Sequence, residues 1–321
     1  MKEIPLRVGV VGVGNMGRNH LRVLSSMREY ELIGCFDNNR ESCSEQAEQY
    51  QIAAFGNQED LFSHVDVVSI AVPSSLHKDS AVSAARAGCH VLVEKPIALS
   101  VEDADAIILA CKEARVKLCV GHIERYNPAV ATLQNVLSKE KIITVTFERM
   151  SPPVPRISDT SVVEDLMIHD IDVLISLIDS PIKKIVSQGV KIYSDSLDFA
   201  QALISFENGA LASLTASRVT EAKIRTARIS AEKSYISVNY LSRTVEISRK
   251  TNFSLDVGYA IQYTQENIIE KIMVPITEPL RAEFEHFAQC IRNDKKVATS
   301  GEMAKQALLI CQQIQDIALE G

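Results

Sequence analysis

The first 120 residues combine two hydrophobic patterns. Short, continuous apolar runs rich in β-branched residues are typical of strands buried on both faces, and the segments between them have helical spacing. We expect strands at 6–12, 31–36, 66–72, 89–93 and 117–120. We expect helices at 15–27, 39–51, 75–87 and 101–115. Repeated βα units with apolar strands and right-handed crossovers predict a doubly wound parallel sheet with helices on both faces.

From residue 142 onward, apolar and polar positions alternate instead. This period is typical of strands in an antiparallel sheet that has one face free to pack on something else. Strands are expected at 142–149, 199–206, 210–217, 223–231 and 244–248. The Asn208-Gly209 pair between the second and third of them predicts a hairpin. Helices are expected at 162–178, 280–293 and 301–319. The prediction is an α/β protein whose parallel-sheet domain covers residues 1–122 and whose mostly antiparallel domain covers 123–321.

Composition narrows the class of protein. The 321 residues carry a formal net charge of −7 and no basic block, which argues against nucleic-acid binding. No apolar run reaches the roughly 18 residues of a membrane helix, and the first residues lack the apolar core of a signal peptide, so we expect a cytoplasmic protein. The seven cysteines are scattered without a CxxC pair, which argues against a disulfide framework and a zinc site.

A glycine-rich motif follows the first predicted strand and opens the first helix. Its residues are Gly12, Gly14, Asn15, Met16 and Gly17, with Val13 inside the GxGxxG pattern. The first glycine permits a tight turn, the second allows the backbone to approach a pyrophosphate, and the third allows close packing of helix and strand. In this context the motif predicts a dinucleotide site at the helix N-terminus.

The residue at the end of the second predicted strand indicates whether the cofactor is NAD or NADP. Asp37 lies there, 20 residues after Gly17, where a carboxylate can accept hydrogen bonds from a ribose diol and repel a 2′-phosphate. NAD is therefore favoured over NADP. Arg40 is close enough to face a phosphate or to lie over the adenine ring.

Further polar residues follow other strands of the parallel sheet, where such sheets bind ligands. Glu94 and Lys95 follow the strand 89–93, and a partly desolvated lysine near a nicotinamide suits proton exchange with a hydroxyl. A surface Glu-Lys-Pro turn is an equally good interpretation of these two residues alone. The other candidates for cofactor or substrate contact are Ser74, His77, His122, Arg125 and Asn127. His20, His64, His90 and His286 have no evident partner and are interpreted as structural.

The predicted helix 162–178 is apolar except for a polar stripe. Asp165 and His169 are four residues apart and share a face, with Asp172 one turn further. Such a stripe either forms an internal hydrogen-bonded network or lines a cleft, because buried charges are costly. In a cleft, the carboxylate would orient the imidazole and stabilise its protonated form. A metal site lacks an evident third ligand, so we expect no metal.

Taken together, these motifs resemble the glucose–fructose oxidoreductase/inositol dehydrogenase (Gfo/Idh/MocA) family. The residues that carry the resemblance are Gly12–Gly17, Ala71–Pro73, Glu94–Pro96, Gly121–Pro128 and the Asp165/His169 pair. The resemblance implies a Rossmann domain, a second domain with an open antiparallel sheet that forms a homodimer or homotetramer, a nicotinamide cofactor, and oxidation of a sugar hydroxyl. It also implies that Lys95 lies beside the reacting hydroxyl, with His169 as acid/base and Asp165 as its orienting carboxylate.

A narrower likeness points to a branch of this family. Residues 121–130, 151–156 and 165–172 resemble the branch that contains UDP-N-acetylglucosamine 3-dehydrogenases, which make a 3-keto sugar nucleotide on the way to amino sugars of lipopolysaccharide. In this branch Arg156 is a candidate for binding the substrate diphosphate or a carboxylate. The residues leave open whether Lys95 or His169 is the base. The alternatives are a dehydrogenase of a free polyol or sugar, such as an inositol, and a non-catalytic NAD-binding regulator.

Overall fold

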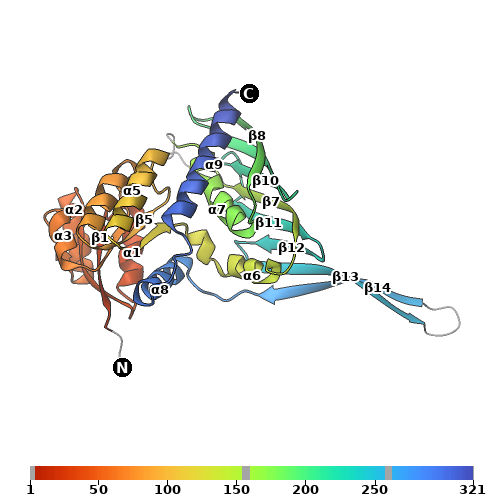
Figure 1. The fold of residues 1–321 in the computed structure, drawn as a ribbon, viewed down its shortest axis with the longest axis horizontal. Coiled ribbons are helices and arrows are strands. Elements are labelled where there is room, and N and C mark those ends of the chain that lie inside the picture. The colour runs from red at the N-terminus through yellow and green to blue at the C-terminus, as the bar shows by residue number, and fades with distance from the viewer. Residues whose placement is uncertain (1–3, 154–159, 257–261, 321) are drawn as a thin grey trace. The chain divides into compact units, whose positions relative to one another are not determined.

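Two β-sheets organise the chain, one in each of two structural units (Figure 1). The computed structural model describes residues 4–153, 160–256 and 262–320. The first unit comprises Met1–Tyr126 and Thr277–Leu309, and the second comprises Asn127–Ile276 and Ile310–Gly321. The α/β fold class predicted from the sequence is confirmed in both units.

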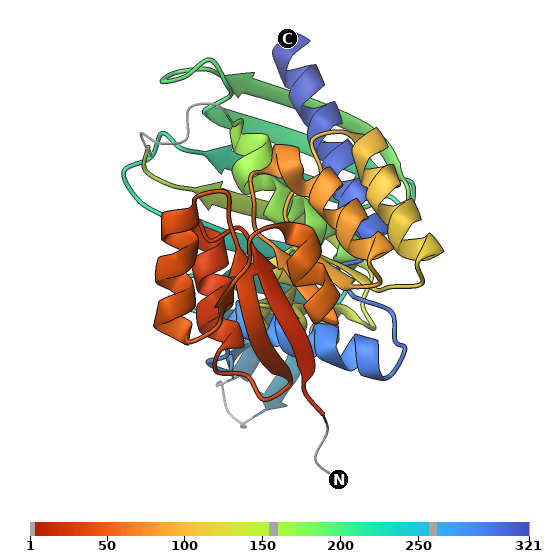
Figure 2. The same cartoon turned by 90° about the vertical axis from the view of Figure 1, so that its left-hand side faces the viewer.

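The first unit contains a six-stranded parallel sheet in the order β3-β2-β1-β4-β5-β6. Helices lie on both sides of this sheet, as Figure 2 shows. The strands are β1 (Leu6–Val11), β2 (Tyr30–Phe36), β3 (Ala53–Ala54), β4 (Val67–Ile70), β5 (His90–Glu94) and β6 (Leu118–Gly121). The helices between them are α1 (Asn15–Leu24), α2 (Arg40–Tyr50), α3 (Gln58–His64), α4 (His77–Arg86) and α5 (Val101–Glu113). Short β3 and α3 lie in a stretch where the sequence pattern predicted no element.

Helix α8 (Pro279–Arg292) also belongs to the first unit. The sequence prediction placed residues 277–309 in the second domain, and the structure groups them with the first. The reason is the apolar face of α8, whose Phe284 and Phe287 are fully buried in the core that includes Val8 and Val10 of β1. The hydroxyl of Tyr30 on β2 donates to the Phe284 carbonyl at 2.8 Å. The burial of these aromatic side chains, rather than the position of α8 along the chain, therefore determines the unit to which the helix belongs.

The second unit contains an eight-stranded sheet in the order β14-β13-β12-β11-β7-β10-β9-β8. All neighbouring strands are antiparallel except β7 and β10, which are parallel. Its strands are β7 (Ile142–Met150), β8 (Ile182–Val190), β9 (Phe199–Phe206), β10 (Leu211–Ser217), β11 (Ile224–Ala231), β12 (Ser234–Asn239), β13 (Thr244–Asp256) and β14 (Gln262–Met273). The predicted hairpin joins β9 to β10, with Gly209 at φ +88°. The sheet has more strands than predicted because β8, β12 and β14 were not expected.

Among the described residues, helices cover one face of this second sheet and leave the other face, here called the open face, exposed. Helix α7 (Ile168–Leu177) and the part of helix α9 (Gly301–Glu320) that belongs to this unit, from Ile310 onward, lie along the covered face in Figure 1. Ser187 of β8 donates its hydroxyl proton to the Ile314 carbonyl of α9. Helix α6 (Pro128–Leu137) belongs to the same unit. Along β9 the side chains alternate between buried and exposed. On the open face Leu203 and Leu211 are more than half exposed.

Within the described ranges, no helix is both long enough and apolar enough to cross a membrane. All seven cysteines are buried free thiols.

Candidate active site

The glycine-rich turn lies between β1 and α1 in the first unit. Gly12 has φ +88°, and a Cβ there would lie 2.6 Å from the Ala71 carbonyl oxygen. A Cβ at Gly17 would lie 1.8 Å from the Gly12 carbonyl oxygen. A Cβ at Gly14, by contrast, would meet no protein atom within 4 Å. Protein packing thus requires glycine at positions 12 and 17, whereas the open space at Gly14 fits the close approach of a dinucleotide to the backbone.

This difference gives a paired prediction for two alanine substitutions. Gly17→Ala is expected to lower the free energy of unfolding by about 3 kcal/mol or more, because the backbone must move to admit the methyl group. Gly14→Ala is expected to leave stability within about 0.5 kcal/mol of the wild type. The same variant should weaken NAD binding by about tenfold or more, about 1.4 kcal/mol.

Thermal unfolding and titration calorimetry with NAD measure the two effects separately. Equal losses of stability in both variants would contradict the assignment, as would unchanged NAD affinity in Gly14→Ala.

Asp37 follows β2 and contacts the same turn. Its two carboxylate oxygens accept the amide hydrogens of Val13 at 2.7 Å and Asn39 at 2.8 Å. A carboxylate has about four acceptor positions, so these bonds leave capacity for a ribose diol. The Arg40 guanidinium donates to the carbonyl oxygens of Phe55 at 3.4 Å and Gly56 at 2.6 Å. Contact of Arg40 with a cofactor stays a prediction.

Lys95 immediately follows the end of β5, at the edge of the sheet where β4 also ends. The buried His77 connects the two strand ends, since its ring nitrogens lie 2.9 Å from the Pro96 carbonyl oxygen and 3.0 Å from the Val72 carbonyl oxygen. Burial lowers the pKa of His77, and its hydrogen bonds to the main chain offset this only in part. His77 thus contacts protein groups through both nitrogens. Contact of Ser74, in the short turn Ser74–Leu76, with a cofactor stays a prediction.

The residues after β6 fall at the end of the first unit and the start of the second. His122 is buried, and the Arg125 guanidinium donates to the Ala298 carbonyl oxygen at 3.4 Å. Asn127 caps helix α6, with its side-chain oxygen accepting the Ala129 amide at 3.0 Å. Contact of His122, Arg125 and Asn127 with a substrate stays a prediction.

Asp165 and His169 lie in the second unit, on a helix that differs from the uninterrupted one predicted. Residues Val163–Met167 form a π-helical turn that carries Asp165, and α7 begins at Ile168 directly before His169. Single π turns in helices occur frequently at functional sites. Arg156 lies outside the described residues.

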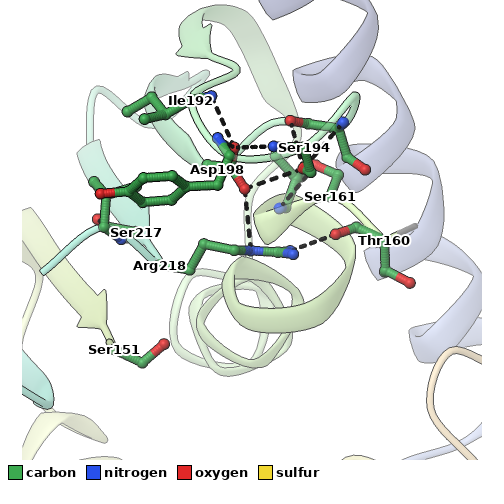
Figure 3. A network of polar contacts seen from close by, with 12 residues as sticks. Ser151, Thr160, Ser161, Ile192, Ser194, Asp198, Ser217 and Arg218 are labelled. Carbon is green, nitrogen blue, oxygen red and sulfur yellow. Dashed lines mark hydrogen bonds and ion pairs between the residues drawn. The ribbon is translucent and has the colours of Figure 1, made fainter. Parts of the chain in front are cut away.

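A polar network fixes the start of this helix (Figure 3). The fully buried Asp198 accepts the amide hydrogens of Ile192, Tyr193 and Ser194 at 2.8, 2.7 and 3.1 Å. It also lies 3.8 Å from the Arg218 guanidinium, which donates to the Thr160 carbonyl. The segment that leads into the π turn is therefore anchored by a buried ion pair, a feature that the sequence analysis missed.

A second buried ion pair holds α7 against β7. The Arg149 guanidinium contacts both carboxylate oxygens of Asp170, at 2.9 and 2.8 Å, and the two side chains are 3% and 4% exposed. Asp170 is the neighbour of His169, so this pair fixes the helix turn that carries the imidazole. A bidentate arginine–carboxylate pair constrains the relative orientation of the two side chains as well as the distance between them.

The donor set of the first unit suits a dinucleotide. The amides at the start of α1 would bind the pyrophosphate, which the open space at Gly14 would admit. The Asp37 carboxylate would bind the ribose. Among the described residues, no group of three or more His, Cys, Asp or Glu side chains could hold a metal ion.

Comparisons with known proteins agree with this geometry. Residues 6–122 match the oxidoreductase family with an NAD-binding Rossmann fold, and residues 141–237 match the GFO/IDH/MocA C-terminal domain. The chain is 32% identical over 318 residues to a UDP-N-acetylglucosamine 3-dehydrogenase of Acidithiobacillus ferrooxidans, covering 99% of this chain and 98% of the relative. A solved structure of that enzyme has a TM-score of 0.91, at 33% identity and 98% coverage of each chain.

More distant relatives share the fold. A scyllo-inositol 2-dehydrogenase (NAD(+)) of Bacillus subtilis is 27% identical over 315 residues, covering 91% of this chain and 88% of the relative. Levoglucosan dehydrogenase in complex with NADH and L-sorbose has a TM-score of 0.87 at 20% identity, with 99% and 98% of the two chains covered. The chain therefore belongs to the Gfo/Idh/MocA family and is an NAD-dependent dehydrogenase.

Proposed function

We propose that this sugar dehydrogenase oxidises the C3 hydroxyl of UDP-N-acetylglucosamine to a ketone. The observation that carries the proposal is the full-length similarity to a UDP-N-acetylglucosamine 3-dehydrogenase, which extends through both units. Residues of the kinds that this reaction needs, a lysine after β5 and an Asp/His pair around a π turn, are present in the chain.

In the proposed mechanism the protein handles the proton. His169 accepts the proton of the C3 hydroxyl, and Asp165 orients the imidazole and stabilises the imidazolium that forms. The Lys95 ammonium donates a hydrogen bond to the hydroxyl oxygen and stabilises negative charge as the O–H bond breaks. The amides of the glycine turn and the Asp37 carboxylate would hold NAD, which would supply the hydride acceptor. With the hydride transferred from C3 and the hydroxyl proton taken by His169, the alcohol would become a ketone.

A substrate panel tests this proposal. UDP-N-acetylglucosamine, UDP-glucose, free N-acetylglucosamine and myo-inositol are each incubated with the enzyme and NAD, and reduced nicotinamide is followed by absorbance. We expect kcat/KM to be highest for UDP-N-acetylglucosamine, by at least about tenfold, since binding energy from the nucleotide supports catalysis at the sugar. Preference for the inositol would favour the polyol alternative. NAD binding without turnover of any substrate would favour the regulator.

We further propose that the open face of the second sheet joins two or more copies of the chain. Its strands carry small hydroxyl residues together with exposed apolar side chains: Val186, Val190, Leu203, Leu211 and Tyr235. A face that exposes several apolar side chains suits self-association better than exposure to water. Size-exclusion chromatography with light scattering should give a homodimer or homotetramer mass, and a monomer at micromolar concentration would contradict the proposal.

The cytoplasmic location expected from the sequence stays a prediction.

A further inference from the structure

A buried chain of polar side chains links three elements of the first unit. His20 of α1 and Ser69 of β4 are fully buried, and Glu94 at the end of β5 is 8% exposed. The His20 Nδ1 atom lies 2.6 Å from the Ser69 hydroxyl oxygen, and its Nε2 atom lies 2.9 Å from Oε1 of Glu94. The ring of Phe284 packs edge-on against the His20 ring, with 5.4 Å between centroids. These contacts engage both ring nitrogens of His20 and pack the Phe284 ring against the imidazole.

Ser69, His20 and Glu94 are connected in the same order as the serine, histidine and carboxylate of a hydrolytic triad. The burial of Ser69, however, excludes a role for it as a nucleophile. Ser69 has no exposed surface and lies in β4, between β1 and β5. A nucleophile must reach its substrate, and a side chain in the interior of the sheet cannot. The other end of this chain of contacts is Glu94, which directly precedes Lys95.

Glu94 connects this chain to Lys95. Its Oε2 atom accepts the Lys95 amide hydrogen at 3.2 Å. The space for the carboxylate is provided by Gly121, which pairs with Glu94 across β5 and β6, because a Cβ at Gly121 would lie 2.9 Å from Oε2. Burial raises the pKa of Glu94. The hydrogen bond and charge of His20 and the charge and amide of Lys95 act in the opposite direction and outweigh burial, so the pKa of Glu94 is lowered overall. The carboxylate thus accepts hydrogen bonds from both sides in its ionised form.

We propose that His20 and Glu94 are positioning residues that fix the turn carrying Lys95. His20 lies three residues after Gly17, on the helix that opens with the dinucleotide turn. One helix thus provides amides for the dinucleotide and, through Glu94, holds the main chain at Lys95. The inference rests on the catalytic role proposed for Lys95.

Two substitutions of His20 separate positioning from general stability. His20→Leu removes the donor to Glu94, whereas His20→Gln keeps an N–H group near the position of Nε2. The matched control is His90→Leu at the opposite end of β5, where the His90 ring accepts the Lys117 amide at 2.9 Å. Glu94→Gln, which replaces one acceptor oxygen by an NH₂ group, serves as a second variant if His20→Leu fails to fold.

We expect kcat of His20→Leu to fall about 10- to 100-fold, as a displacement of about 1 Å of a reacting group does. KM for the sugar and the dissociation constant for NAD should stay within about threefold. His20→Gln should recover most of kcat, His90→Leu should remain within about twofold of the wild type, and Glu94→Gln should behave as His20→Leu does. Wild-type kcat in both His20→Leu and Glu94→Gln would overturn the proposal. So would a loss of NAD affinity that accounts for the fall in kcat, or failure of His20→Gln to recover activity.

A second readout does not depend on the identity of the sugar. The rate at which an amine-acylating reagent modifies Lys95 in the NAD-free protein is measured by mass spectrometry, with Lys112 of α5 as internal reference. Release of the turn should raise this rate at least threefold in His20→Leu but not in His20→Gln or His90→Leu. If the wild type does not oxidise UDP-N-acetylglucosamine but Lys95 reactivity changes as expected, the proposed function fails and the positioning role stands. Unchanged reactivity in His20→Leu would overturn the positioning role itself.

Discussion

Replacing Lys95 with alanine is expected to lower kcat for sugar oxidation by about 10²- to 10³-fold, the usual cost of removing one hydrogen-bond donor to an oxygen that becomes negatively charged. The ammonium group is expected to contact the reacting hydroxyl, so its loss removes stabilisation that is greatest in the transition state. NAD affinity should change little, because the glycine turn and Asp37 would supply the cofactor contacts. Steady-state turnover from nicotinamide absorbance, together with calorimetric NAD binding, measures both quantities.

The matched control for this variant is Lys112→Ala. Lys112 lies in the last turn of α5, away from the end of β5, and its removal should leave kcat within about twofold of the wild type, as for ordinary surface substitutions. Turnover of Lys95→Ala close to that of the control would show that the lysine takes no part in the reaction.

Replacing Arg149 with alanine is expected to destabilise the protein by about 3–5 kcal/mol, because it leaves the Asp170 carboxylate buried without its partner. Both side chains are nearly inaccessible to water, and the guanidinium contacts both oxygens of the carboxylate. Chemical unfolding followed by circular dichroism measures the loss. The double variant Arg149→Met/Asp170→Leu should recover much of it, since a well-packed apolar pair is often as stable as a buried ion pair.

An exposed ion pair of the first unit provides the comparison. Arg7 of β1 lies 2.6 Å from Asp66, but these side chains are 50% and 38% exposed. Arg7→Ala should therefore cost little stability, as the loss of an exposed pair does. Similar losses from Arg149→Ala and Arg7→Ala would refute the idea that the buried pair holds α7 in place.

Much of the fold follows from hydrophobic periodicity. Continuous apolar runs predicted the strands of the parallel sheet except β3. Alternation predicted β7, β9, β10, β11 and the start of β13, together with the Asn-Gly hairpin. The position of α8 could not be predicted in this way, because an amphipathic helix does not specify which core buries its apolar face. Helix spacing also predicts only regular helices, so the π turn at Val163–Met167 was missed.

The candidate site was predicted unevenly. The glycine motif was found because its spacing reflects close backbone contacts. The buried partners were missed, although their positions gave a clue. Arg149 occupies an inward position next to Phe147 in an alternating strand, and His20 lies on the buried face of α1 beside Leu21. A charged or polar residue at an apolar position requires a partner, but the sequence alone does not identify Asp170 or Glu94.

The central claim is that this protein transfers a hydride from C3 of UDP-N-acetylglucosamine to NAD. Its most direct test is a single-turnover reaction with substrate deuterated at C3, in which the nicotinamide product is examined by mass spectrometry and NMR. We expect deuterium at C4 of the reduced nicotinamide, together with a 3-keto sugar nucleotide as the other product. Reduced nicotinamide without deuterium, or a complete absence of reduction while deuterated inositol or a free sugar transfers its label, would contradict it.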